Sequence, residues 1–135
     1  MTWSELRTDV VVLVCAVSAG IHAALAPEHF REATAAGLGF AGSTAALTVI
    51  AVALTRRADS TPWLAASAIV LGGLIVAYAL AVTTGVPVVM PEPESVDGLA
   101  LVTKAVEAVG LLAAATALRR PRAGHSLTRL EGSHP

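Results

Sequence analysis

Two oppositely charged residues, Lys104 and Glu107, interrupt the last apolar run of this 135-residue chain. A charged side chain at the centre of a membrane-spanning helix costs about 2.5–3.5 kcal/mol on insertion scales, so such residues mark ion pairs or polar sites. Their three-residue spacing places both on one face of a helix, where they can pair. Two interpretations follow: a structural ion pair in which Lys104 extends towards the nearer membrane surface, or a functional polar group inside the membrane.

A second group of polar residues lies near the end of the first apolar run, where His22 is followed by Glu28 and His29. Imidazole nitrogens and carboxylate oxygens are ligands that Zn²⁺ or Cu²⁺ accepts, and Met90 could add a sulfur ligand for Cu⁺. The two histidines are seven residues apart, and we expect a turn at Pro27 to separate them. The alternative to a metal site is therefore that His22 hydrogen-bonds to a neighbouring helix while His29 is solvated.

The two groups would meet if the first and last helices were in contact. In that case His22, Lys104 and Glu107 form a polar pocket in the half of the bundle that faces out of the cell. Zn or Cu at His22, Glu28 and His29 is the only cofactor that the residues suggest.

The composition indicates which elements would position these residues. Apolar residues make up 55% of the chain and charged residues 14%, whereas water-soluble domains average about 45–50% and about 25%. Each apolar run can cross most of a hydrocarbon layer roughly 30 Å thick. The sequence therefore predicts an all-α, four-helix transmembrane domain over residues 1–118, with helices at about 6–26, 33–54, 62–82 and 99–118. A basic tail over residues 119–135 is expected to be disordered.

The basic residues predict the orientation of the bundle. The turn between the second and third helices holds Arg56 and Arg57, and Arg119 and Arg120 follow the fourth helix. The segment between the third and fourth helices contains three acids and no Lys or Arg. Because positive charge stays on the cytoplasmic side, both termini and the tail are predicted to be cytoplasmic. The expected location is the plasma or inner membrane, crossed several times.

Small residues recur at four-residue spacing and predict close helix packing. The first helix has Ala16, Gly20 and Ala24, and the last has Gly110 and Ala114. Such stripes let helix backbones approach closely in lipid. In so alanine-rich a chain they also arise by chance, and the alternative is that some of them face lipid.

Three short motifs carry a resemblance to known proteins: Gly20-Ile21-His22, Pro27-Glu28-His29-Phe30 and Lys104-Ala-Val-Glu107. Together they resemble a group of small four-helix integral membrane proteins of actinobacterial type, of unassigned function, with a His-x5-Glu-His motif. The plan is also loosely similar to DoxX-like families. The resemblance implies the fold and its topology. DoxX-like proteins are associated with redox partners, but Cys15 is the only cysteine here and offers no thiol pair.

Three functions remain open at this point. The first is a non-enzymatic accessory or partner-binding subunit, because no nucleotide motif or nucleophile–base pair is apparent. The second is a protein that binds a metal ion or small ligand at its outer face. The third is a minimal transporter that forms oligomers. The expected partners are the lipid bilayer and another membrane protein or a second copy. Nucleic acid is not expected, because no aromatic residue lies between the arginines of the tail.

Overall fold

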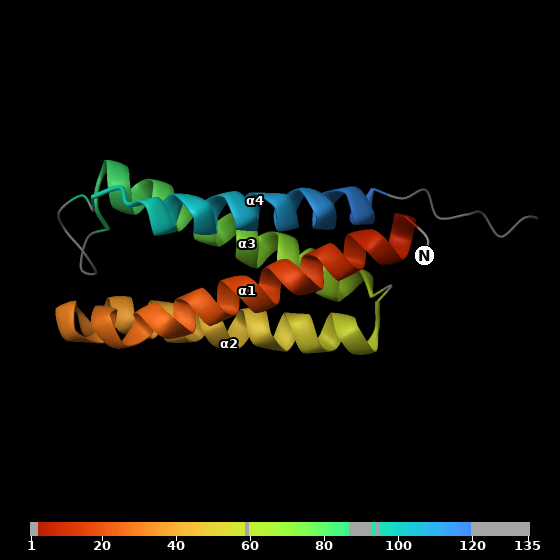
Figure 1. The fold of residues 1–135 in the computed structure, drawn as a ribbon, viewed down its shortest axis with the longest axis horizontal. Coiled ribbons are helices and arrows are strands. Elements are labelled where there is room, and N and C mark those ends of the chain that lie inside the picture. The colour runs from red at the N-terminus through yellow and green to blue at the C-terminus, as the bar shows by residue number, and fades with distance from the viewer. Residues whose placement is uncertain (1–2, 59, 87–92, 94, 120–135) are drawn as a thin grey trace, which may run out of the picture.

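The computed structural model describes residues 3–58, 60–86, 93 and 95–119, and within these ranges the chain forms four α-helices (Figure 1). They are α1 (Trp3–Glu32), α2 (Thr34–Arg56), α3 (Thr61–Thr83) and α4 (Gly98–Leu118). All four are long and apolar enough to cross a membrane, so the predicted all-α class with four such helices is confirmed. Met90 and the tail beyond Arg119 lie outside the described residues, and the statements made about them stay predictions.

The first helix is longer than predicted, because it continues to Glu32 instead of ending at residue 26. Pro27 lies inside it, where it removes the N–H that would bond to the carbonyl four residues earlier and its ring crowds that carbonyl. Helical hydrogen bonding resumes beyond it, where the N–H of Ala33 donates to the carbonyl of His29 at 2.9 Å. The turn expected between His22 and His29 was therefore wrong, and the two histidines lie two helical turns apart on one face.

Tertiary contacts with α2 stabilise the last turns of α1. A single extended residue, Ala33 (φ −153°, ψ 126°), separates the two helices. Gly37 leaves room for the ring of Phe30, since a Cβ at this position would overlap that ring. The rings of His29 and Phe40 are stacked, with centroids 3.8 Å apart. These contacts close α1 and α2 into a tight helical hairpin.

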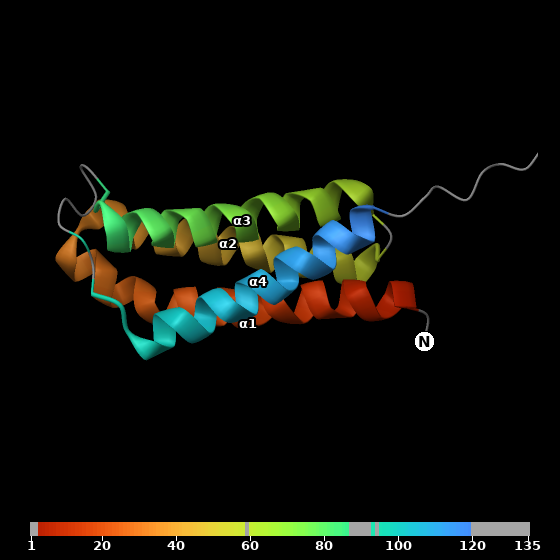
Figure 2. The ribbon, with the colours of Figure 1, turned by 90° about the horizontal axis from the view of Figure 1, so that it is seen from above.

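The second hairpin, α3 with α4, packs against the first mainly through α1 and α4, which cross each other at an angle (Figures 1 and 2). Gly110 lies at this crossing, where an added Cβ would be 2.5 Å from Val14 Cγ1 and 3.0 Å from Leu71 Cδ1. The contact between the first and last helices, on which the predicted pocket depended, is present. The buried core around it is apolar and includes Val11, Val14, Cys15, Leu47, Leu54, Leu71 and Ala114.

The two predicted stripes of small residues differ in burial. Gly110 and Ala114 are buried in the bundle. Ala16, Gly20 and Ala24 are exposed on the outside of α1, and a Cβ at Gly20 would have no atom within 4 Å. The stripe of α1 therefore does not pack within the bundle, because its spacing alone does not say which side of the helix faces the neighbours.

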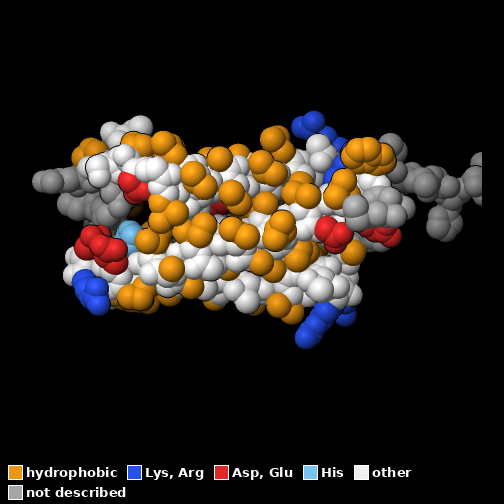
Figure 3. Space-filling view, in the orientation of Figure 1, with side chains coloured by type: hydrophobic (Ala, Val, Ile, Leu, Met, Phe, Trp, Pro, Cys, Tyr) orange, Lys and Arg blue, Asp and Glu red, His pale blue; other side chains and the backbone are white. Residues whose placement is uncertain are grey.

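Large apolar side chains cover the outside of the bundle, as Figure 3 shows for one face. Leu13, Ile69 and Leu112 are each at least 64% exposed although they lie in the middle stretches of their helices. In a water-soluble bundle the outward positions are polar. The sides of this bundle thus suit a hydrocarbon environment, while most of the charged side chains visible on this face lie near its two ends (Figure 3).

Candidate functional site

A pocket of about 620 Å³ lies between the two hairpins, at the end of the bundle where α1 and α3 end and α2 and α4 begin. Figure 3 shows this end as a hollow flanked by histidine and acidic side chains. All four helices contribute to the lining. Its walls are largely apolar and include Ile21, Leu25, Phe40, Leu74, Ala77 and Leu99.

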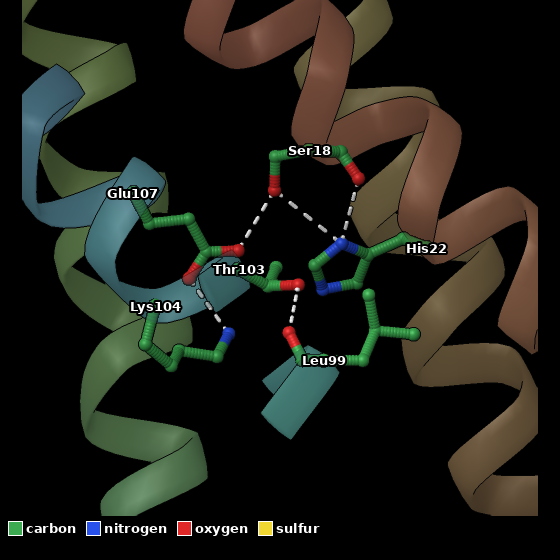
Figure 4. A network of polar contacts seen from close by, with 6 residues as sticks. All are labelled: Ser18, His22, Leu99, Thr103, Lys104 and Glu107. Atoms are coloured by element: carbon green, nitrogen blue, oxygen red, sulfur yellow. Dashed lines mark hydrogen bonds and ion pairs between the residues drawn. The ribbon is translucent and has the colours of Figure 1, made fainter. Parts of the chain in front are cut away.

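The deepest polar group is the carboxylate of Glu107, which is 0% exposed. Its Oε2 accepts a hydrogen bond from Lys104 Nζ at 2.6 Å, one turn earlier on α4. Its Oε1 accepts a hydrogen bond from Ser18 Oγ on α1 at 2.7 Å (Figure 4). Both carboxylate oxygens therefore have donors, which is the condition under which a buried charge can be tolerated.

His22 joins this network from one turn further along α1 and is 6% exposed. Its Nδ1 lies 2.9 Å from the carbonyl oxygen of Ser18 and 3.4 Å from the hydroxyl of the same residue (Figure 4). A carbonyl can only accept, so Nδ1 carries the hydrogen. The imidazole ring lines the pocket.

Tyr78 brings a hydroxyl group from α3. Among the described residues it supplies the only buried side-chain oxygen or nitrogen without a hydrogen-bond partner. Lys104 Nζ lies 5.6 Å from the centre of its ring, and both residues line the pocket. A buried hydroxyl without a partner costs about 1–3 kcal/mol. A polar atom of a bound molecule could supply the missing hydrogen bond.

Acidic residues line the mouth of the pocket. Glu28 and Glu32 lie one turn apart at the end of α1, and Asp97 precedes α4. Asp97 also caps α4, since its Oδ1 accepts a hydrogen bond from the backbone N–H of Ala100 at 2.8 Å. The mouth therefore combines negative charge with apolar walls behind it.

The predicted metal ligands line the same pocket but are not gathered around one point. His29 Nδ1 is engaged with the carbonyl of Leu25 at 3.0 Å. Over the residues that the structure describes, no three His, Cys, Asp or Glu side chains form a group that could hold a metal ion. The geometry of His22, Glu28 and His29 thus gives no support to the metal hypothesis.

The structure places the three residues of the predicted polar pocket in one region. His22 and Lys104 line the pocket, while Glu107 does not line it and is joined to it by its ion pair with Lys104. One turn beyond Glu107, Gly110 packs against an apolar layer of the core. On this side the polar network is therefore followed by apolar core.

Sequence reasoning did not assign Ser18, Thr103 or Tyr78 to the site. A signal existed for the first two. Ser18 lies one turn before His22 on the same face of α1, and Thr103 lies one turn before Glu107 on α4. The hydroxyl of Thr103, which lines the pocket, donates to the carbonyl of Leu99 at 2.8 Å. Nothing in the sequence linked Tyr78 of α3 to these helices.

No protein-family model, curated protein or solved structure matches this chain. The resemblance to actinobacterial-type and DoxX-like membrane proteins therefore stays a prediction. What the chain does has to be inferred from the geometry of the pocket.

Proposed function

We propose that this chain is a multi-pass protein of the cell membrane that binds a small, largely apolar molecule between its two helical hairpins. The observation that carries the proposal is the pocket itself, whose largely apolar lining also includes Tyr78 and Lys104. Pockets for small molecules typically measure about 300–1,000 Å³ and combine apolar walls with a few polar groups. The volume of about 620 Å³ lies within that range.

The distribution of charge supports an orientation with the pocket on the outer side. The pocket end carries Glu28, Glu32 and Asp97 with Arg31 as the one arginine among the described residues there. The described arginines of the opposite end, where α1 begins and α4 ends, are Arg7, Arg56, Arg57 and Arg119. Positive charge is retained on the cytoplasmic side, and the exposed apolar sides of the helices would face lipid.

Reporter fusions test this orientation. A cytoplasm-specific reporter joined after Arg57 is expected to be active, and an export-specific reporter joined after Asp97 is expected to be active, because these positions lie at opposite ends of the bundle. The reverse pattern would place the pocket on the cytoplasmic side and contradict the proposed orientation.

Photolabelling tests the binding function. A neutral alkyl diazirine is expected to label Tyr78 in the purified full-length protein, and Gly39→Leu is expected to abolish that label because Gly39 lines the pocket. Gly20→Leu is the matched control. A Cβ at either glycine has no atom within 4 Å, so both variants should fold, but Gly20 lies on the outside of α1.

Two results would contradict the proposal. One is the absence of label on Tyr78 in the unmodified protein. The other is an equal label in the Gly39→Leu and Gly20→Leu variants, since the probe would then reach Tyr78 without entering the pocket.

A further inference from the structure

The charges that line the pocket are unbalanced. Its described lining contains three acids, Glu28, Glu32 and Asp97, and Lys104 as the only Lys or Arg. The ammonium group of Lys104 is 2.6 Å from the carboxylate of Glu107, so its positive charge is already offset. A molecule entering the pocket therefore meets a negative field, which becomes stronger where apolar walls exclude water.

The arrangement of these acids does not suit a metal ion. Metal ions of biological sites need several donor atoms converging on one point. The described residues contain no such group of His, Cys, Asp or Glu. The three acids are instead spread along the mouth, two on α1 and one ahead of α4. This arrangement suits a bulky cation whose charge is distributed over several atoms.

Aromatic rings and apolar side chains supply the other contacts that such a cation uses. Phe40 of α2 and Tyr78 of α3 line the pocket from different hairpins. The ring of Phe40 is stacked on that of His29 at 3.8 Å, which fixes its orientation. Aromatic faces attract cations held within about 6 Å, and they do so more strongly where water is excluded. Lys104 Nζ already lies 5.6 Å from the centre of the Tyr78 ring, and His29 covers one face of Phe40, so a ligand cation would use the ring surface that these two residues leave uncovered.

We infer that the pocket selects organic cations with an apolar body over anions of the same shape. This inference rests on the proposed binding function and adds the charge of the ligand to it. The acids Glu28 and Glu32 attract the positive charge at the mouth, and the apolar walls contact the body of the molecule. Tyr78 and Lys104 line the same pocket behind these acids.

Tetraphenylphosphonium and tetraphenylborate test the inference, because they share one shape and carry opposite charges. Each is added to the full-length protein in an uncharged detergent at low salt, and competition with the diazirine label on Tyr78 is measured. We expect the phosphonium to compete on the order of tenfold more strongly than the borate. Equal or stronger competition by the borate would overturn the inference. The proposed binding function would still be supported in that case by the label on Tyr78.

A pair of double variants identifies the acids responsible. Glu28→Gln/Glu32→Gln is expected to weaken phosphonium binding about threefold for each charge removed, on the order of tenfold in total. Glu5→Gln/Asp9→Asn removes the same charge from exposed positions at the other end of α1 and should leave binding unchanged. All four residues are exposed, so neither variant disturbs the core. An equal loss in both double variants, or no loss in the first, would contradict the assignment of Glu28 and Glu32.

Discussion

Ser18→Ala would remove the hydrogen bond that joins α1 to the buried carboxylate of α4. The Ser18 hydroxyl is fully buried and lies 2.7 Å from Glu107 Oε1. Hydrogen bonds to charged groups contribute about 1.5–3 kcal/mol in soluble proteins, whereas bonds between transmembrane helices average about 0.6 and reach about 1.7 kcal/mol. Glu107 is 0% exposed and would keep the bond from Lys104. We therefore expect the free energy of unfolding to fall by about 1.5 kcal/mol, roughly tenfold in the equilibrium constant.

Ser67→Ala is the matched control for this measurement. Ser67 is also 0% exposed, but its hydroxyl donates to the carbonyl of Leu64 in its own helix at 2.8 Å. Losing that bond should change stability little, because alanine is the better helix former. Circular dichroism of the purified variants during titration with sodium dodecyl sulfate gives both free energies. The reasoning is refuted if Ser67→Ala destabilises the protein as much as Ser18→Ala.

Two further predictions concern the helix α4. Lys104→Met removes the charged partner of the Glu107 carboxylate, so the free energy of unfolding should fall by about 2–3 kcal/mol. This is less than the loss expected for a fully buried pair, because the Lys104 side chain is 18% exposed. Lys104→Met/Glu107→Met should recover most of that loss in the same titration, and a double variant less stable than the single one would contradict this account. Gly110→Ala should cost about 1–3 kcal/mol, because its Cβ would lie 2.5 Å from Val14 Cγ1. Gly73→Ala, with no atom within 4 Å, should instead stabilise the protein by up to about 1 kcal/mol, and equal effects of the two glycine substitutions would be inconsistent with the crossing described.

The four helices were predictable because each is a long apolar run that ends at charged residues, prolines or glycines. The ends of α2, α3 and α4 follow these local signals closely. The end of α1 did not, since Pro27 was taken as a stop. Beyond Pro27, Phe30 of α1 packs against Gly37 of α2, and such a contact between helices cannot be inferred from the residues next to Pro27.

The contacts of the site were likewise predictable only in part. The ion pair between Lys104 and Glu107 is visible in the sequence, because both residues lie on one face of one helix. The bond from Ser18 to Glu107 joins residues 89 positions apart and depends on how α1 crosses α4. The place of Tyr78 depends likewise on how the second hairpin packs, so neither residue could be assigned from spacing alone.

The single residue that links α1 to α2 sets an order of assembly. Closing a loop costs more conformational entropy as the loop lengthens, so this hairpin forms at the least entropic cost. Ser18 and Glu107, whose hydrogen bond joins α1 to α4 beside the pocket, are far apart in the chain and meet only after α4 has been made. During synthesis, which proceeds from the N-terminus, the first hairpin is therefore finished early, and the pocket, which all four helices line, is complete only when the last helix arrives.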